Sequence, residues 1–284
     1  MRIKSHVVLS LEEESLIESV YSIVKPKYRI KCNGDLYIMD MFTDSVEYQT
    51  LMEFLERNPA TSKNEVFTET YDDKELTQAL LLQMIPNAYQ GGYPQPESGT
   101  LETKYISVSF DRSNACPYCT KGIIQDRPLR LRNNIKLGRQ SDISGIWWLR
   151  DYVISGRLKD LILEEGLTGC EIWPVIMHGA DKPFEDLFQL KFTGELPAMA
   201  PETNIILDPT MNHPKACSPG TRLEGPVIYR RDDLIDIPDF ALSKEWFGGN
   251  GAYWRWPFMS QRAYQLFKRN KIKGIRWSLP KIID

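Results

Sequence analysis

The stretch ISGRLKDLILEEGLTGC, residues 154–170, decides how this 284-residue chain is interpreted, because MSQRAYQLFKRNKIKGI, residues 259–275, aligns with it without a gap. The two stretches lie 105 residues apart. Each predicts a serine-capped helix with apolar residues at helical spacing, followed by a glycine turn into an apolar strand. The identical pairs are Ser155 and Ser260, Arg157 and Arg262, Leu161 and Leu266, and Gly169 and Gly274. The sequence therefore predicts an internal duplication.

The cysteines extend this duplication toward the N-terminus. CPYCTK at residues 116–121 matches CSPGTR at residues 217–222, with an offset of 101 residues. In each half an expected strand leads to the cysteine loop and another strand leaves it. The expected strands are 105–110 and 123–131 in the first half, and 204–207 and 227–229 in the second. We predict repeats over about 103–176 and 203–284, within a duplicated unit that spans 101–284.

The first 100 residues are expected to form a separate, helix-rich unit. Ser10 and Glu13 have the spacing of a capping box and predict a helix over about 11–23. Further helices are expected at about 45–57 and 73–85, each ending before a proline. Glycine and proline concentrate in residues 87–100, which we expect to be a linker. The predicted fold is thus α+β, with a helix-rich N-terminal unit followed by a duplicated strand–cysteine loop–strand–helix–strand unit.

Charge differs in sign between the two parts of the chain. Residues 1–110 carry 10 Lys or Arg and 17 Asp or Glu, a net charge of −7, whereas the remaining residues have a net charge of +4. The whole chain, at −3, is not a strongly basic nucleic-acid binder. No secretory signal or apolar run of membrane-spanning length is recognised, and the five cysteines are an odd number. We therefore expect a cytoplasmic protein in a reducing compartment, with no membrane contact.

The cysteine loops contain the residue types of a structural zinc site. Cys116 and Cys119 form a CxxC knuckle, and the second loop supplies Cys217 and His213. Thiolate and imidazole are good zinc ligands, so Cys116, Cys119, His213 and Cys217 are the predicted metal ligands. Four protein ligands leave no coordination position for water, so such a zinc would stabilise the second unit without hydrolysing anything. The alternative is a degenerate knuckle that has lost its metal, because Gly220 stands where a second cysteine would be.

Catalytic motifs are not found in the sequence. There is no phosphate-binding GxxxxGK[ST], no HExxH, no GxSxG and no GxGxxG after a strand. His178 has Asp181 and Glu185 nearby, which suggests an acid–base pair, although a solvated turn explains the same residues. We therefore expect a protein without enzymatic activity.

Two basic stretches suggest an alternative of another class. Residues 127–139 and 262–281 contain no acidic residue, and Tyr253, Trp254, Trp256 and Trp277 lie in or near the second stretch. Basic and aromatic side chains together bind nucleic acid in many proteins. The alternative is thus a zinc-ribbon-like nucleic-acid-binding or regulatory protein. The simpler interpretation places these charges on the outer faces of a strand and a helix and argues against nucleic-acid binding.

Residues 103–284 resemble the bacterial double-CxxCG motif proteins. The resemblance rests on the cysteine knuckle, the ISGR-led helix followed by LTGCEIWPV, the second cysteine loop, GPVIYRRDDL and the terminal MSQR-led helix. The first motif keeps Cys116 and Cys119 but has Thr120 for its glycine, and the second keeps only Cys217.

The resemblance implies a cytoplasmic immunity protein of a polymorphic or contact-delivered toxin system, which binds and neutralises a cognate protein toxin without catalysis. The first 100 residues have no counterpart in the resemblance and are where partner specificity is expected. Their acidity suits a basic toxin surface, for example that of a nuclease.

Overall fold

A computed structural model describes most of the chain. The described residues are 1–11, 13–58, 62–90, 108–118, 121–132, 137, 141–146, 151–211, 215, 217–249 and 252–284. The chain divides into two compact units, Met1–Leu76 and Thr77–Asp284. Residues 77–90, which the sequence analysis assigned to the first unit, belong to the second, and most of the expected linker lies outside the described residues. No described helix is long and apolar enough to cross a membrane.

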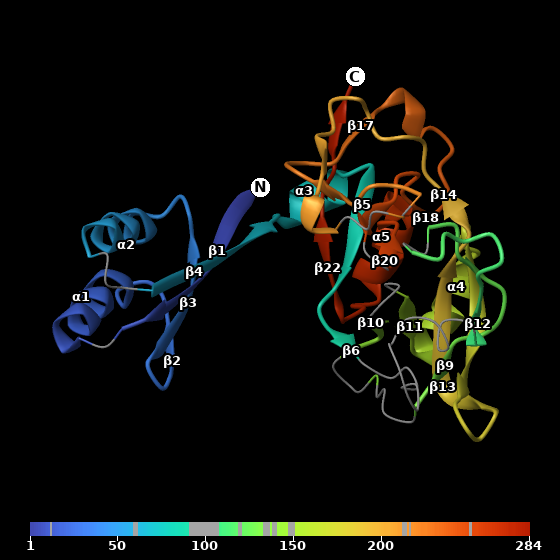
Figure 1. The fold of residues 1–284 in the computed structure, drawn as a ribbon, viewed down its shortest axis with the longest axis horizontal. Coiled ribbons are helices and arrows are strands. Elements are labelled where there is room, and N and C mark those ends of the chain that lie inside the picture. Colours follow the sequence, from blue (N-terminus) through green and yellow to red (C-terminus); the bar gives the residue numbers. More distant parts are fainter. Residues whose placement is uncertain are drawn as a thin grey trace. The chain divides into compact units, whose positions relative to one another are not determined.

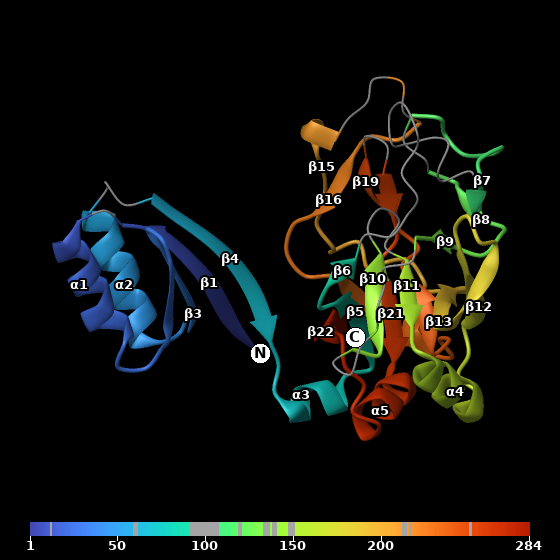
Figure 2. The ribbon, with the colours of Figure 1, turned by 90° about the horizontal axis from the view of Figure 1, so that it is seen from below.

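The first unit is a four-stranded antiparallel sheet with two helices on one face (Figures 1 and 2). Its strands, in the spatial order β2–β3–β1–β4, are β1 (Arg2–Ser10), β2 (Ile30–Asn33), β3 (Leu36–Phe42) and β4 (Ser62–Thr70). The helices are α1 (Glu14–Val24) and α2 (Val46–Arg57). Alternation along β1 buries Val7 and Leu9 beneath the helices, where they pack with Val20 and Leu51.

The expectation of a helix-rich first unit is wrong, because the described structure is mostly β. Ser10 ends β1 instead of capping a helix, and α1 begins after Glu13 without a side-chain cap. The capping box lies elsewhere, where the Glu75 N–H donates to Asp72 Oδ1 (2.8 Å) and the Asp72 N–H donates to Glu75 Oε2 (2.9 Å). It opens the short helix α3 (Asp73–Gln78). The rest of the helix expected at 73–85 is instead the strand β5 (Leu81–Pro86).

The elements of the second unit fall into two successive sets, which the predicted duplication assigns to a first and a second copy. The first copy comprises β5, β6 (Tyr89–Gln90), β7 (Phe110–Asp111), β8 (Ile124–Gln125), β9 (Arg130–Leu131), β10 (Ile143–Ile146), β11 (Tyr152–Ile154), α4 (Gly156–Glu165) and β12 (Cys170–Met177). The second comprises β13 (Lys182–Phe192), β14 (Gly194–Glu195), β15 (Ile205–Leu207), β16 (Thr221–Leu223), β17 (Ile228–Arg230), β18 (Phe240–Leu242), β19 (Phe247–Gly249), β20 (Ala252–Trp254), β21 (Pro257–Ser260), α5 (Gln261–Arg269), β22 (Ile275–Ser278) and β23 (Lys281–Ile283). Short 3₁₀ turns occur at Pro209–Met211 and Asp232–Leu234.

The two copies exchange their first strands. β5 begins the first copy but lies between β21 and β22 of the second, with Leu82 opposite Met259. β13 begins the second copy but lies between β11 and β12 of the first, with Phe188 opposite Ile154. Each central sheet is therefore completed by a strand from the other copy, which joins the two copies into one unit.

This exchange also places the start of each repeat earlier than the sequence analysis did. LLQ at residues 81–83 matches LFQ at 187–189, an offset of 106 residues. Leu81 pairs in sequence with Leu187, and Gln83 with Gln189. The repeats thus begin at β5 and β13, about 20 residues before the starts expected at 103 and 203.

The predicted serine caps and glycine turns are confirmed. Ser155 Oγ accepts from the Leu158 N–H (3.3 Å) and Ser260 Oγ from the Ala263 N–H (3.1 Å). After the helices, Gly169 and Gly274 have φ values of 78° and 104°. A Cβ at Gly169 would lie 2.1 Å from the carbonyl oxygen of Phe240, and one at Gly274 would lie 2.1 Å from that of Ile143. Each glycine thus lets its copy approach a strand of the other.

Two aspartates join the copies around these glycines. Asp142 pairs with Arg157 of its own copy (2.8 Å) and accepts from the Lys273 N–H of the other (3.0 Å). Asp239 repeats this arrangement with Arg262 (2.9 Å) and the Thr168 N–H (2.9 Å). Figure 2 shows α4 and α5 at the same end of the unit, with the hairpins of the cysteine loops at the other end.

Candidate functional site

Each cysteine loop follows a strand that ends in the same kind of turn. In the first copy, Asp111 accepts hydrogen bonds from the N–H and the hydroxyl of Ser113, at 2.9 and 2.8 Å. In the second copy, Asp208 accepts from the N–H and the hydroxyl of Thr210, at 3.0 and 2.6 Å. The hydrogen bonds from Ser113 lower the pKa of Asp111 below its ordinary value, so the carboxylate is kept in its charged form. These Asp-x-Ser/Thr turns lead the backbone of each copy into its cysteine loop.

The two cysteine loops meet. The Cys217 N–H donates to Cys116 Sγ at 3.4 Å, and Lys121 Nζ lies 3.3 Å from Ser218 Oγ. The hydroxyl of Tyr253 donates to the carbonyl oxygen of Ser218 at 3.0 Å, which holds the second loop against β20. The fold thus brings together equivalent loops of the two copies, in which Cys116 and Cys217 are 101 residues apart in sequence.

Two of the four predicted zinc ligands, Cys116 and Cys217, therefore lie side by side. The other two, Cys119 and His213, lie outside the described residues. Among the residues that the structure describes, no group of three or more His, Cys, Asp or Glu side chains is arranged to hold a metal. The contact joins the Cys217 backbone to the Cys116 sulfur, so it brings the two residues together but does not show both thiols facing one metal position. The complete site depends on Cys119 and His213 and stays a prediction.

Cys170 has a different environment. It begins β12, and burial raises the pKa of its thiol to about 12, assisted by the charges of Asp239 and Glu171. The raised pKa favours the protonated thiol, which is the less reactive form. The repeat pairs Cys170 with Ile275 and so predicted a core position, but Cys170 is only partly buried.

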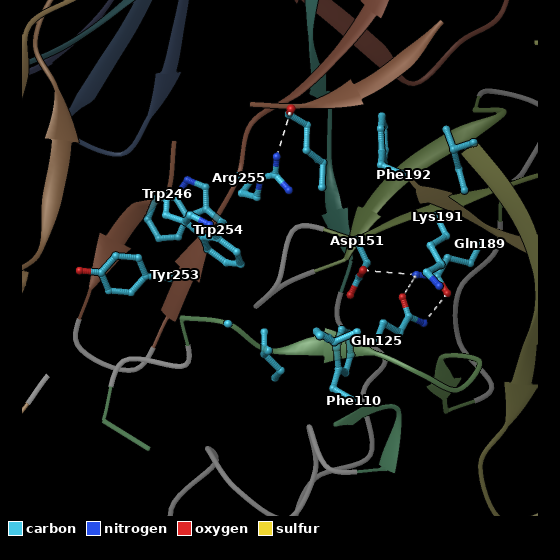
Figure 3. Close-up of a pocket in the computed structure, with 15 residues that line it drawn as sticks. Phe110, Gln125, Asp151, Gln189, Lys191, Phe192, Trp246, Tyr253, Trp254 and Arg255 are labelled. Atoms are coloured by element: carbon cyan, nitrogen blue, oxygen red, sulfur yellow. Dashed lines mark hydrogen bonds between the residues drawn. The ribbon is translucent and has the colours of Figure 1, made fainter. Parts of the chain in front are cut away.

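A pocket of about 450 Å³ lies between the two copies of the second unit (Figure 3). Its polar floor is an amide pair, in which Gln125 and Gln189 donate to each other at 2.7 Å. The side chain of Gln189, which is 1% exposed, also donates to Asp151 Oδ1 at 3.3 Å. Figure 3 shows Trp246, Tyr253, Trp254 and Arg255 on the other side of the pocket.

The charges of this pocket are compensated by neighbours. Arg255 pairs with Glu195 at 2.6 Å and also donates to the backbone carbonyl of Ser243. Lys191 lies 3.6 Å from Glu171 and 3.6 Å above the ring of Trp173. Hydrogen bonds and ion pairs therefore fix the walls of the pocket and give it a rigid, mixed aromatic and polar surface.

The pocket could not be predicted from the sequence, because its residues come from several segments that lie far apart in the chain. The Gln83/Gln189 identity between the repeats is a signal that could have drawn attention to one of them. A polar residue repeated within an apolar strand indicates a buried hydrogen-bonding role, which Gln189 has.

His178 lies in a shallow groove with Arg127, Arg130 and Asp181. The carboxylate of Asp181 pairs with Arg130, and the backbone N–H of His178 donates to the carbonyl oxygen of Leu131 at 2.9 Å. Asp181 has a φ of 52° in the turn that joins β12 to β13. The geometry is that of a solvated turn, in which the carboxylate of Asp181 pairs with the guanidinium of Arg130 and not with the imidazole of His178.

The aromatic residues considered for nucleic-acid binding are part of the core. Tyr253 is 2% exposed, and Trp254 and Trp256 pack against the cluster that contains Phe247. Trp277 makes edge contacts with the rings of Tyr264 and Phe267, with centroids 5.5 and 6.0 Å apart. These rings therefore pack within the second unit, and Tyr253 and Trp254 also line the pocket between the copies.

No family model matches the sequence, and no curated protein matches it.

Proposed function

We propose that this protein is a bacterial immunity-type protein, which binds and neutralises a cognate toxin in the cytoplasm without catalysis. One observation carries the proposal. The residues that resemble the double-CxxCG proteins lie in the second unit, whereas the first 76 residues form a separate compact unit of opposite charge. A duplicated scaffold joined to a separate acidic unit is the organisation expected when one part supplies the frame and the other selects the partner.

The first unit is acidic, and its two helices carry several exposed glutamates. Residues 1–76 contain 9 Lys or Arg and 15 Asp or Glu, a net charge of −6. The helices and the N-cap of α1 present five exposed glutamates, Glu13, Glu14, Glu18, Glu53 and Glu56, which we call the acidic helix layer. Only Arg57 adds a basic side chain to these two helices. Such a surface increases the association rate with a basic protein.

The proposal is tested by co-expression. The gene next to this one is expected to encode a large secreted protein with a toxic C-terminal domain. Cells that produce this domain should survive when they also produce the full-length protein, and the two proteins should co-purify. Cells that die despite soluble expression of both proteins would contradict the proposal.

Charge reversal locates the partner. The triple variant Glu14→Lys, Glu18→Lys, Glu53→Lys should lower the association rate about tenfold or more at low salt, because attraction becomes repulsion. The exposed Glu164 on α4 offers a matched control, and Glu164→Lys should leave the rate unchanged. Equal losses in both variants would place the toxin elsewhere on the chain.

A further inference from the structure

The strand β4 forms a long exposed edge of the sheet in the first unit. It has nine residues, whereas β2 at the other edge of this sheet has only four. Val66 and Phe67, adjacent residues at the centre of β4, are 56% and 58% exposed. Edge strands offer their outer backbone N–H and C=O groups to another strand, and long edges with exposed apolar side chains are the ones that pair.

We propose that β4 pairs with β4 of a second copy of this chain. The two strands run antiparallel about a two-fold axis at Val66, so that the four-stranded sheets of two protomers become one sheet of eight strands. This proposal does not depend on the toxin-neutralising function.

Charge complementarity selects this partner and this register. With Val66 opposite Val66 of the second copy, all nine residues pair, and Lys63 lies opposite Glu69 at both ends of the contact. Lys63 is the only basic residue of β4. It pairs with Glu65 of its own strand at 2.9 Å, and its side chain is still 40% exposed. Opposite charges on facing residues stabilise an antiparallel pair.

The neighbouring symmetric registers are unfavourable. A shift of the axis to Glu65 places Glu65 opposite its own copy, and a shift to Phe67 places Glu65 opposite Glu69. Like charges on facing residues destabilise a sheet. Of these three registers, only the one centred at Val66 avoids like charges on facing residues and pairs all nine residues of the strand.

The exposed apolar side chains also find partners in this register. Val66 meets Val66 of the second copy on the sheet face opposite the helices, because residue 66 is opposite His6 in β1 and not beside the buried Val7. Phe67 points to the helix face and lies diagonally across from Phe67 of the second copy, a separation that aromatic rings can span. Pairing would therefore cover the two exposed apolar residues of β4.

Cysteine cross-linking tests the register in the full-length protein. Facing residues of an antiparallel pair have Cα atoms about 4.5–5.5 Å apart, which permits a disulfide. Val66→Cys should therefore form a covalent dimer with oxidised glutathione. Asn64→Cys is the matched control on the same face, and residue 64 lies about 14 Å from its own copy, four residues along the strand. Asn64→Cys and Thr68→Cys should cross-link only when mixed, because residue 64 faces residue 68. The unmodified chain measures any cross-linking by its native cysteines.

Charge exchange tests the contact without cysteine chemistry. Analytical ultracentrifugation should give a mass that rises with concentration from 32.9 kDa to about twice that value. Lys63→Glu and Glu69→Lys should each raise the dissociation constant about fivefold or more, and the double exchange should restore it, because two opposite pairs are lost and then remade. Circular dichroism of each variant confirms that the first unit is folded.

Three results would overturn the proposal. They are a mass of one chain at all concentrations, equal cross-linking of the residue-64 and residue-66 variants, and a dimer that both single charge variants leave intact. A complex of this edge with a different protein, in a chain that is itself monomeric, would also overturn it.

Discussion

At the residue scale, Gly169 illustrates how a single missing side chain permits the contact between the copies. Gly169 has a φ of 78°, which disfavours any residue with a side chain. A Cβ at this position would also lie 2.1 Å from the carbonyl oxygen of Phe240. We predict that Gly169→Ala lowers the free energy of unfolding by about 3 kcal/mol or more in urea titrations. Gly166→Ala is the matched control, since Gly166 has a φ of 65° but no atom within 4 Å of the Cβ position. It should cost only about 1 kcal/mol. Equal costs would show that backbone strain alone matters.

Zinc content is the second prediction at this scale. If Cys119 and His213 join Cys116 and Cys217, protein purified without chelator should contain about one zinc per chain by elemental analysis. Cys116→Ser should then remove the metal and lower the melting temperature of the second unit, because structural zinc contributes directly to folding free energy. Cys170→Ser is the control and should keep the zinc. Protein without zinc would favour the alternative of a degenerate knuckle.

At the scale of elements, the duplicated helices depend on the same cap. Ser155→Ala and Ser260→Ala should each lower the free energy of unfolding by about 1 kcal/mol, because each removes the acceptor for an N–H at the helix start. Glu13→Ala at the start of α1 should change it by less than about 0.5 kcal/mol, since Glu13 makes no side-chain cap. Thermal and urea unfolding of the three variants measure the difference. A cost at Glu13 as large as at the serines would contradict this assignment.

At the scale of the whole molecule, the strand exchange makes the two copies depend on each other. The exposed turn at residues 178–181 separates the copies in sequence. Fragments 77–179 and 180–284 should therefore fold only together, because each would otherwise lack the central strand of its sheet. Co-expressed fragments, one carrying an affinity tag, should co-purify and unfold in one cooperative transition. A fragment that folds as a monomer by itself would show that the exchange is not required.

The sequence by itself determined the features that depend on local chemistry. A serine cap, apolar residues at helical spacing and a glycine turn are set by neighbouring residues, so the paired helices after Ser155 and Ser260 were correctly predicted. The strand 204–207 was likewise recognised from its own residues. The capping box at Ser10 was wrong because the spacing alone does not show that Ser10 already belongs to a strand, where pairing with β3 and β4 holds it.

Only the tertiary structure decided the features that depend on distant partners. Residues 79–85, ALLLQMI, have an apolar pattern suited to a helix, but pairing with β21 and β22 on both sides makes residues 81–86 a central strand. The same pairing assigns this segment to the second unit, and only the fold shows that Trp254 and Trp256 pack against its core. Caps and turns are stabilised by interactions between residues that are close in sequence. Strand pairing and burial are stabilised by contacts between residues up to almost 200 positions apart, which no local pattern encodes.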